Sequence, residues 1–238
     1  MLTSFSISSA LLCRRNVGLY TIVLLSVAVL NFDCLSEVKV DPTSPARFLW
    51  KKDVALGPVE SYSVELTVDG RGKFCFKRRD QEALTRELIL NPTVTENLAG
   101  LFTRADFLNE SKDFVSRRKV ADMGMKTVSC EVAGRKRQVI YNYTEDKTLQ
   151  EISNFFENLS TQERNLFEID LALKYDRLGI PKKLDELERE FAAKRIVAPE
   201  RFAEVLEKIS QDQTLINLAR KHAEKLLSKI ETSSPARR

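Results

Sequence analysis

Apolar and polar residues alternate along two stretches of this chain, and a short turn-forming segment interrupts each of them. The first stretch covers residues 61–77 and contains Asp-Gly-Arg-Gly at 69–72; the second covers 127–143 and contains Gly-Arg-Lys at 134–136. A period of two places successive side chains on opposite faces, which is typical of a half-buried β-strand. Each stretch is therefore predicted to form a β-hairpin.

The apolar residues between and after the predicted hairpins recur every three to four positions, and this period predicts helices. Helices are expected over 81–90 and 93–108, between the hairpins, and over 148–159, after the second hairpin. The polar and basic stretch 109–124 is expected to be largely loop.

Beyond residue 160 the helical period continues almost to the end of the chain. Thr161 is suited to cap a helix that runs to Leu178, where a Gly-Ile-Pro sequence forms a stop signal. Three further helices are expected: one over 182–195, one that begins at Pro199 and one that begins after Asp212.

This order of elements predicts an α+β fold. Two hairpins, each followed by a helix, suggest a four-stranded antiparallel sheet with helices on one face, followed by a C-terminal helical bundle. The chain then divides into an N-terminal segment, a linker, an α+β hairpin-helix domain, a helical region and a disordered tail: residues 1–36, 37–58, 59–160, 161–231 and 232–238. The pattern is compatible with one shared core or with two separate ones.

The N-terminal segment indicates where the protein works. Residues 17–32 carry no charge and directly follow Arg14 and Arg15. A basic pair before an apolar run directs a chain into the secretory pathway, with the arginines retained on the cytoplasmic side. As a helix the run is about 24 Å long, between a signal-peptide core and a membrane span. We expect either a signal peptide cleaved before Glu37 or an inner-membrane anchor, with the rest of the chain periplasmic or secreted.

Composition and charge limit the classes of partner that are expected. The chain has 38 basic and 34 acidic residues, a net charge of +4, and 43% hydrophobic residues. So small an excess predicts no strong attraction to polyanions, and the apolar content is sufficient for a folded core. Export also separates the protein from RNA, so no nucleic-acid partner is expected.

Three basic clusters lie within the predicted sheet region, at 77–79, 117–119 and 135–137. Most of these side chains are expected to be solvated and to protect the sheet edges by their charge. The alternative is that basic residues at the two hairpin turns contact an anionic surface, such as phospholipid headgroups or an acidic envelope polymer. The residues of that candidate contact are Arg71, Lys73, Arg135, Lys136 and Arg137.

The sequence contains no recognisable catalytic, cofactor or metal motif. His222 is the only histidine, which excludes a zinc HExxH helix and a multi-histidine metal site, and its helical spacing predicts a position at the edge of a helical interface. GxSxG, GxxxxGK[ST] and GxGxxG are all absent. Carboxylates are abundant, so an acid/base pair stays open; Asp122 and Asp170 have the most apolar neighbours.

Two cysteines lie in the predicted sheet. Cys75 shares its face of the strand with two lysines, whereas Cys130 shares its face with valines. The two thiols are therefore expected on opposite faces of the sheet, which argues against a disulfide that an oxidising compartment would permit.

Four segments carry a resemblance to known proteins: ELTVDGRGKFCF, LAGLFTRADF, VSCEVAGRKRQVIYNY and LQEISNFFENL. The region 61–187, about half of the chain, resembles uncharacterised bacterial exported proteins with a small α+β domain of unknown function. The resemblance implies an envelope location and a role that is not enzymatic.

The leading hypothesis is an exported or membrane-tethered binding or scaffolding protein of the bacterial cell envelope, without catalytic activity. Its expected partner is an envelope protein or an anionic surface, with the membrane contacted through residues 17–32 if that segment is retained. Two alternatives are a carboxylate-based envelope hydrolase and a secreted inhibitor that presents a hairpin turn, 69–72 or 134–137, to its target.

Overall fold

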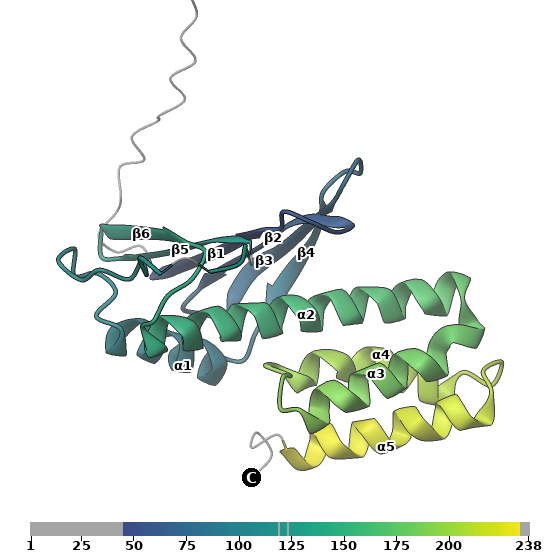
Figure 1. Ribbon diagram of the computed structural model, residues 1–238. Helices are drawn as coiled ribbons and strands as arrows, with labels where there is room; N and C mark the ends of the chain where they lie inside the picture. Colours follow the sequence, from purple (N-terminus) through teal and green to yellow (C-terminus); the bar gives the residue numbers. More distant parts are fainter. Residues whose placement is uncertain (1–44, 119, 123, 234–238) are drawn as a thin grey trace, which may run out of the picture. The chain divides into compact units, whose positions relative to one another are not determined.

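The computed structural model describes residues 45–118, 120–122 and 124–233 (Figure 1). The predicted export segment, its cleavage site before Glu37 and the tail beyond residue 233 lie outside the described residues. Among the helices of the described ranges, none has both the length and the apolar character required to cross a membrane.

Six antiparallel strands form one open sheet in the order β4-β3-β2-β1-β5-β6. The strands are β1 (Arg47–Asp53), β2 (Val59–Thr67), β3 (Arg71–Arg78), β4 (Leu84–Ile89), β5 (Met125–Val132) and β6 (Arg135–Tyr141). Both predicted hairpins are confirmed, as the pairs β2-β3 and β5-β6. The α+β class is also confirmed. The sheet has six strands where four were predicted, because the prediction contained neither β1 nor β4.

Strand β1 lies within the segment 37–58 that was expected to be a linker. It pairs with β2 on one side and with β5 on the other, and so joins the two hairpins into one sheet. Its neighbouring prolines, Pro45 and Pro58, lie outside the strand, where they cost no ladder hydrogen bond. Phe48 and Trp50 are buried on the same face of β1, which ties this strand into the core.

The helix predicted over 81–90 is wrong, because this segment contains strand β4. Its Ala, Glu and Leu residues favour helix, which explains the error. In the structure Leu88 and Leu90 are buried two positions apart, while Ile89 between them is exposed. Pairing with β3 and burial of these leucines override the local helix propensity.

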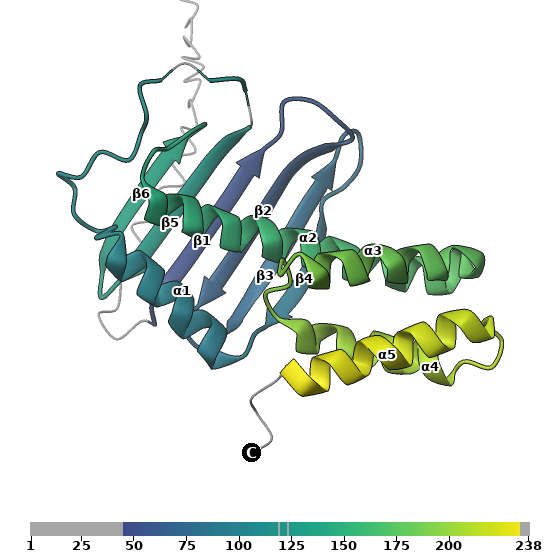
Figure 2. The same cartoon turned by 60° about the horizontal axis from the view of Figure 1, so that its bottom comes forward.

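One face of the sheet is covered by helices α1 (Pro92–Arg104) and α2 (Lys147–Tyr175), as Figures 1 and 2 show. Between the sheet and these helices lies a cluster of buried side chains, in which Trp50 stacks on Phe156 with ring centroids 6.0 Å apart. The aromatic members of this cluster are Phe48, Trp50, Phe74, Phe76, Phe102, Phe107, Phe114, Tyr141 and Phe156. The opposite face of the sheet is left open by the helices.

Helix α2 is continuous over 29 residues, although two helices were expected with a break before Thr161. Ser160, Gln162 and Glu163 around that position are all buried. The helix therefore continues past the expected break, because these side chains are packed against other elements. Asp146 caps the helix by accepting a hydrogen bond from the backbone N–H of Leu149 at 2.8 Å.

The C-terminal half is helical, as predicted. It comprises α3 (Ile180–Ala192), α4 (Ala203–Gln211) and α5 (Asn217–Ser233), with short 3-10 helices η1 (Arg177–Gly179) and η2 (Pro199–Phe202) before α3 and α4. A second hydrophobic cluster holds these helices and the end of α2 together; it includes Leu166, Ile169, Leu184, Phe202, Leu206 and Leu226. The buried residues thus form two clusters, and α2 contributes to both.

Candidate binding surface

The open face of the sheet carries the side chains that point away from the helices. Every strand pair is antiparallel, and the register shifts only at Val59–Ser61 of β2, so these side chains form rows that cross the sheet. The row next to the hairpin turns contains Ile89, Arg71, Thr67, Arg47, Glu131 and Lys136. The second row contains Glu87, Lys73, Glu65, Leu49, Ser129 and Gln138.

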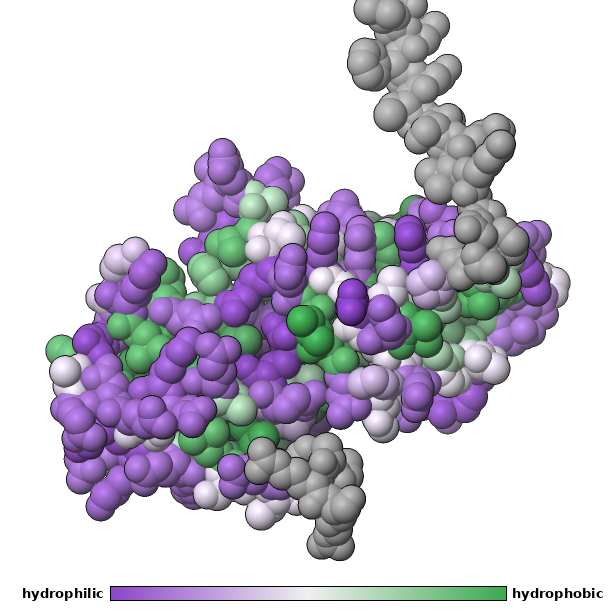
Figure 3. Space-filling view, turned by 180° about the vertical axis from the view of Figure 1, so that it is seen from behind, coloured by the Kyte–Doolittle hydropathy of each residue, from purple (hydrophilic) through white to green (hydrophobic). Residues whose placement is uncertain are grey.

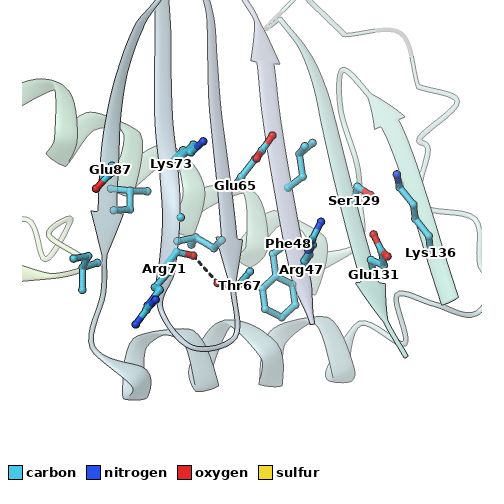
Figure 4. Close-up of a pocket in the computed structure, with 15 residues that line it drawn as sticks. Arg47, Phe48, Glu65, Thr67, Arg71, Lys73, Glu87, Ser129, Glu131 and Lys136 are labelled. Carbon is cyan, nitrogen blue, oxygen red and sulfur yellow. Dashed lines mark hydrogen bonds between the residues drawn. The ribbon is translucent and has the colours of Figure 1, made fainter. Parts of the chain in front are cut away.

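A depression of about 740 Å³ lies over these two rows (Figure 4). Its floor includes the apolar side chain of Leu49 and the backbone of Gly72, and Ile89 lies at the β4 side. Seven charged residues line it, four of them basic and three acidic: Arg47, Arg71, Lys73 and Lys136, and Glu65, Glu87 and Glu131. The depression therefore combines charged groups of both signs with a substantial apolar surface.

Charges of opposite sign alternate across the strands of this surface. Lys73 lies between Glu65 and Glu87 in the register, and Glu131 lies between Arg47 and Lys136. The only ion pair within 4.0 Å that these seven side chains form with other described residues joins Arg71 to Asp69 at 3.8 Å. The charged groups are therefore available to a partner.

The five basic residues predicted from the sequence are divided between the two faces of the sheet. Arg71, Lys73 and Lys136 lie on the open face and line the depression. Arg135 and Arg137 point to the other face, as the alternation along β6 requires. The structure therefore does not bring all five side chains together.

Arg137 holds the loop after α1 against the sheet. Its guanidinium donates hydrogen bonds to the carbonyl oxygens of Phe107 at 2.8 Å and Lys112 at 2.5 Å, and to that of Asn109. The same group lies 4.9 Å from the centroid of the Phe114 ring. Arg135 donates to the carbonyl oxygen of Leu108 at 3.3 Å. These contacts give both arginines a structural role.

Sequence reasoning missed Arg47, Leu49 and the three glutamates of the depression. Arg47 and Leu49 lie in the strand that was taken for a linker. Residues 47–52 read Arg-Phe-Leu-Trp-Lys-Lys, so three apolar residues stand together and no alternation marks the strand. The short apolar and aromatic run from Phe48 to Trp50 was the only local signal from which β1 could have been identified.

The turn of the first hairpin packs against the body of the protein. Gly70 has a φ of +90°, and its carbonyl oxygen accepts a hydrogen bond from the backbone N–H of Leu90 at 2.8 Å. Thr95 of α1 donates its hydroxyl to the carbonyl oxygen of Val68 at 2.8 Å. A projecting tip, as an inhibitory loop would need, is therefore not formed at 69–72.

The candidate acid/base carboxylates lie apart and have separate partners. Asp122 is exposed and accepts a hydrogen bond from the backbone N–H of Gly124 at 2.8 Å, whereas Asp170 pairs with Arg86 at 3.1 Å. The fully buried carboxylate of the described chain belongs to Glu163, which binds Arg201. Within the same ranges, no group of three or more His, Cys, Asp or Glu residues is arranged to hold a metal ion.

The cysteines and the histidine lie where the sequence predicts. Cys75 and Cys130 are free thiols on opposite faces of the sheet, and burial raises the pKa of the Cys130 thiol to about 11. His222 lies between α5 and α3, with Nε2 3.0 Å from Glu188 Oε2 and Nδ1 3.5 Å from Asp185 Oδ1.

Comparison with known proteins found no protein-family model that matches the chain and no matching curated protein. The residues that line the open face offer unpaired charges of both signs around a shallow, partly apolar depression, on a sheet supported from behind by a packed core.

Proposed function

We propose that this chain is a non-catalytic binding protein of the bacterial cell envelope, exported or membrane-tethered, which holds a protein partner on the open face of its sheet. The observation that carries the proposal is the set of alternating charges around the depression of the open face, of which only Arg71 is paired with another described residue. The envelope location rests on the apolar run 17–32 after Arg14 and Arg15.

The alternation of charge favours a protein over a uniformly anionic polymer or lipid surface. A surface of one sign that approached Arg47 and Lys73 would also meet Glu65, Glu87 and Glu131, and those contacts would be repulsive. A protein can place acidic and basic side chains in the complementary order. Opposed charges of this kind increase the association rate and select the partner.

The apolar residues of the face provide a place for a partner's anchor residues. Leu49 is half-buried near the centre of the sheet, and Ile89 is 70% exposed on β4. Side chains in a desolvated centre usually contribute most of the binding free energy, whereas charged residues around them contribute specificity. Leu49 is therefore expected to lie at the centre of the contact.

The buried core behind the open face makes this face suitable as a rigid recognition surface. Trp50 and Phe48 on β1 are buried beneath the depression, and Trp50 stacks on Phe156 of α2. A surface that is already ordered loses little conformational entropy on binding. The strand residues that would contact the partner therefore need no rearrangement of their backbone.

Site-specific photocrosslinking in the native host tests the proposal. A photoreactive amino acid replaces Leu49 in the full chain, and a matched control carries it at exposed Glu224 on α5. We expect a discrete crosslinked protein in the envelope fraction from position 49, and a crosslink weakened by Lys73→Glu. Fractionation with the cytosol, or the same products from both positions, would contradict the proposal.

A further inference from the structure

A group of large apolar side chains is exposed at one end of the helical half, where α2 is followed by η1 and where α5 begins. Leu178 is 86% exposed, Tyr175 is 75% exposed and Leu218 is 68% exposed. We call this group the apolar tip; it consists of Leu171, Tyr175, Leu178, Ile216 and Leu218. Single exposed apolar residues are ordinary on soluble proteins, but a cluster of five is not.

The two segments of the apolar tip lie side by side. Arg177, between Tyr175 and Leu178, donates a hydrogen bond to the carboxylate of Asp212, which begins the turn before α5. Figures 1 and 2 both show the end of α2 and the α4–α5 connection at the same end of the helical half. In Figure 3 apolar side chains lie among hydrophilic ones at this end, on the left of the view.

Basic residues surround the apolar tip. The segments 170–183 and 211–221 contain six basic residues, Lys174, Arg177, Lys182, Lys183, Arg220 and Lys221, and three acidic ones, Asp170, Asp176 and Asp212. Each acidic residue has a partner: Asp170 pairs with Arg86, Asp212 pairs with Arg177, and Asp176 accepts from the backbone N–H of Gly179. Lys183 is paired with Glu168 and Glu186, whereas Lys174, Lys182 and Lys221 form no ion pair within 4.0 Å in the described chain.

We propose that the apolar tip docks on a lipid bilayer that carries anionic headgroups. Leucine and tyrosine side chains at the tip would enter the boundary between headgroups and acyl chains, and the surrounding lysines would contact lipid phosphates. Tyrosine is favoured at this boundary, and each lysine or arginine near an anionic leaflet strengthens binding. Lys174, 5.8 Å from the ring centroid of Tyr175, combines both features in one place.

The charge around the tip favours a bilayer over a second copy of the chain. Two tips in contact would bring their basic residues together, and like charges across an interface repel. This site is separate from the open face of the sheet in its residues and its charge pattern, so the membrane proposal does not depend on the partner proposed there.

Tryptophan fluorescence provides a local test in the full chain. Trp50 is the only tryptophan and is buried, so an introduced Leu178→Trp side chain would report on the tip alone. Leu56→Trp is the matched control, because Leu56 is also 86% exposed but lies in the β1–β2 loop. Both variants are mixed with vesicles of phosphatidylglycerol and phosphatidylcholine, and with vesicles of phosphatidylcholine alone.

We expect a blue shift, and quenching by brominated lipid, only for the Leu178→Trp variant and only with the anionic vesicles. Lys174→Gln and Lys221→Gln should each lower the partition coefficient measured by this signal, by roughly fivefold. An equal response at both positions would assign the binding to residues 17–32 or to non-specific adsorption, and would overturn the proposal. No response at position 178, or a response independent of lipid charge, would also overturn it.

Discussion

Arg201 and Glu163 form an ion pair with two hydrogen bonds, of 2.6 Å from Nε to Oε1 and 2.8 Å from Nη2 to Oε2. The Glu163 side chain is fully buried on α2, and Arg201 comes from η2. The guanidinium also donates to the backbone carbonyl oxygens of Glu87 and Ile89 on β4, at 3.3 and 3.4 Å. One side chain thus connects the helical half, α2 and the edge strand of the sheet.

Replacing Arg201 should therefore be costly. The Arg201→Met variant would leave the Glu163 carboxylate buried without its partner, and such changes cost about 3–5 kcal/mol. Urea denaturation monitored by circular dichroism would measure the change in the free energy of unfolding. The double variant Glu163→Leu/Arg201→Met is the control, because it removes both charges and should recover most of the loss. A small effect of the single variant would show that water reaches Glu163.

The turn of the first hairpin depends on the glycine at position 70. Gly70 has a φ of +90°, and an added Cβ would lie 2.3 Å from the carbonyl oxygen of Leu90. Gly70→Ala should destabilise the protein by about 1–3 kcal/mol, because strain in φ and a backbone clash act together. Gly57→Ala separates the two causes, since Gly57 has a φ of +110° with no atom within 4 Å of its Cβ position. If the two variants lose the same stability by thermal unfolding, the clash at Leu90 contributes nothing.

The open face should bind the proposed partner more weakly when one charge is reversed. In Lys73→Glu, three acidic side chains would lie next to one another across β2, β3 and β4, and the match to an ordered set of charges would be lost. We expect at least a tenfold weaker crosslink yield from position 49, about 1.4 kcal/mol of binding free energy. Lys147→Glu, at an exposed site on α2, should leave the yield unchanged. An equal loss for both would indicate a dependence on net charge alone.

Stability should fall in acid because of one carboxylate of the helical half. Hydrogen bonds from Lys229 and Lys225 lower the pKa of Glu188 to about 2, from an ordinary value of 4.5. A pKa that is lower in the folded state gives stability that is present above pH 4.5 and is lost as the pH falls towards 2. Asp185 and His222 are the other titratable groups that face this cluster.

Urea denaturation at pH 6 and pH 3 would measure this loss. We expect Glu188→Gln to reduce the difference in unfolding free energy between the two pH values. Glu224→Gln, an exposed change on α5, should leave the difference as it is in the wild type. If the Glu188 variant keeps the full difference, the acid sensitivity arises from other carboxylates.

The elements with local signals were predictable, and those decided by distant contacts were not. The two hairpins could be predicted from the alternation of apolar and polar residues around glycine-containing turns. Strand β4 could not be predicted in this way, because its residues favour a helix and it forms a strand only through its pairing with β3. The break expected before Thr161 is also absent, since buried contacts of Gln162 and Glu163 continue the helix.

The candidate surface was predictable only in part for the same reason. Lys73 and Arg71 lie two positions apart on one strand, so the sequence indicates that they share a face. Arg47 and Glu131 meet only because β1 is inserted between the two hairpins. No local pattern encodes that insertion, and the alternation of charge across strands follows from it.

Helix α2 makes the two hydrophobic clusters mechanically dependent on each other. Phe156 packs beneath Trp50 in the first cluster, and Ile169 is buried in the second, about 20 Å further along the same helix. A continuous helix bends little over this distance, so a tilt of the C-terminal helices would be transmitted to the helix-covered face of the sheet. A load applied to one half is thereby transmitted to the other along this helix, in addition to the contacts that Arg201 makes with β4.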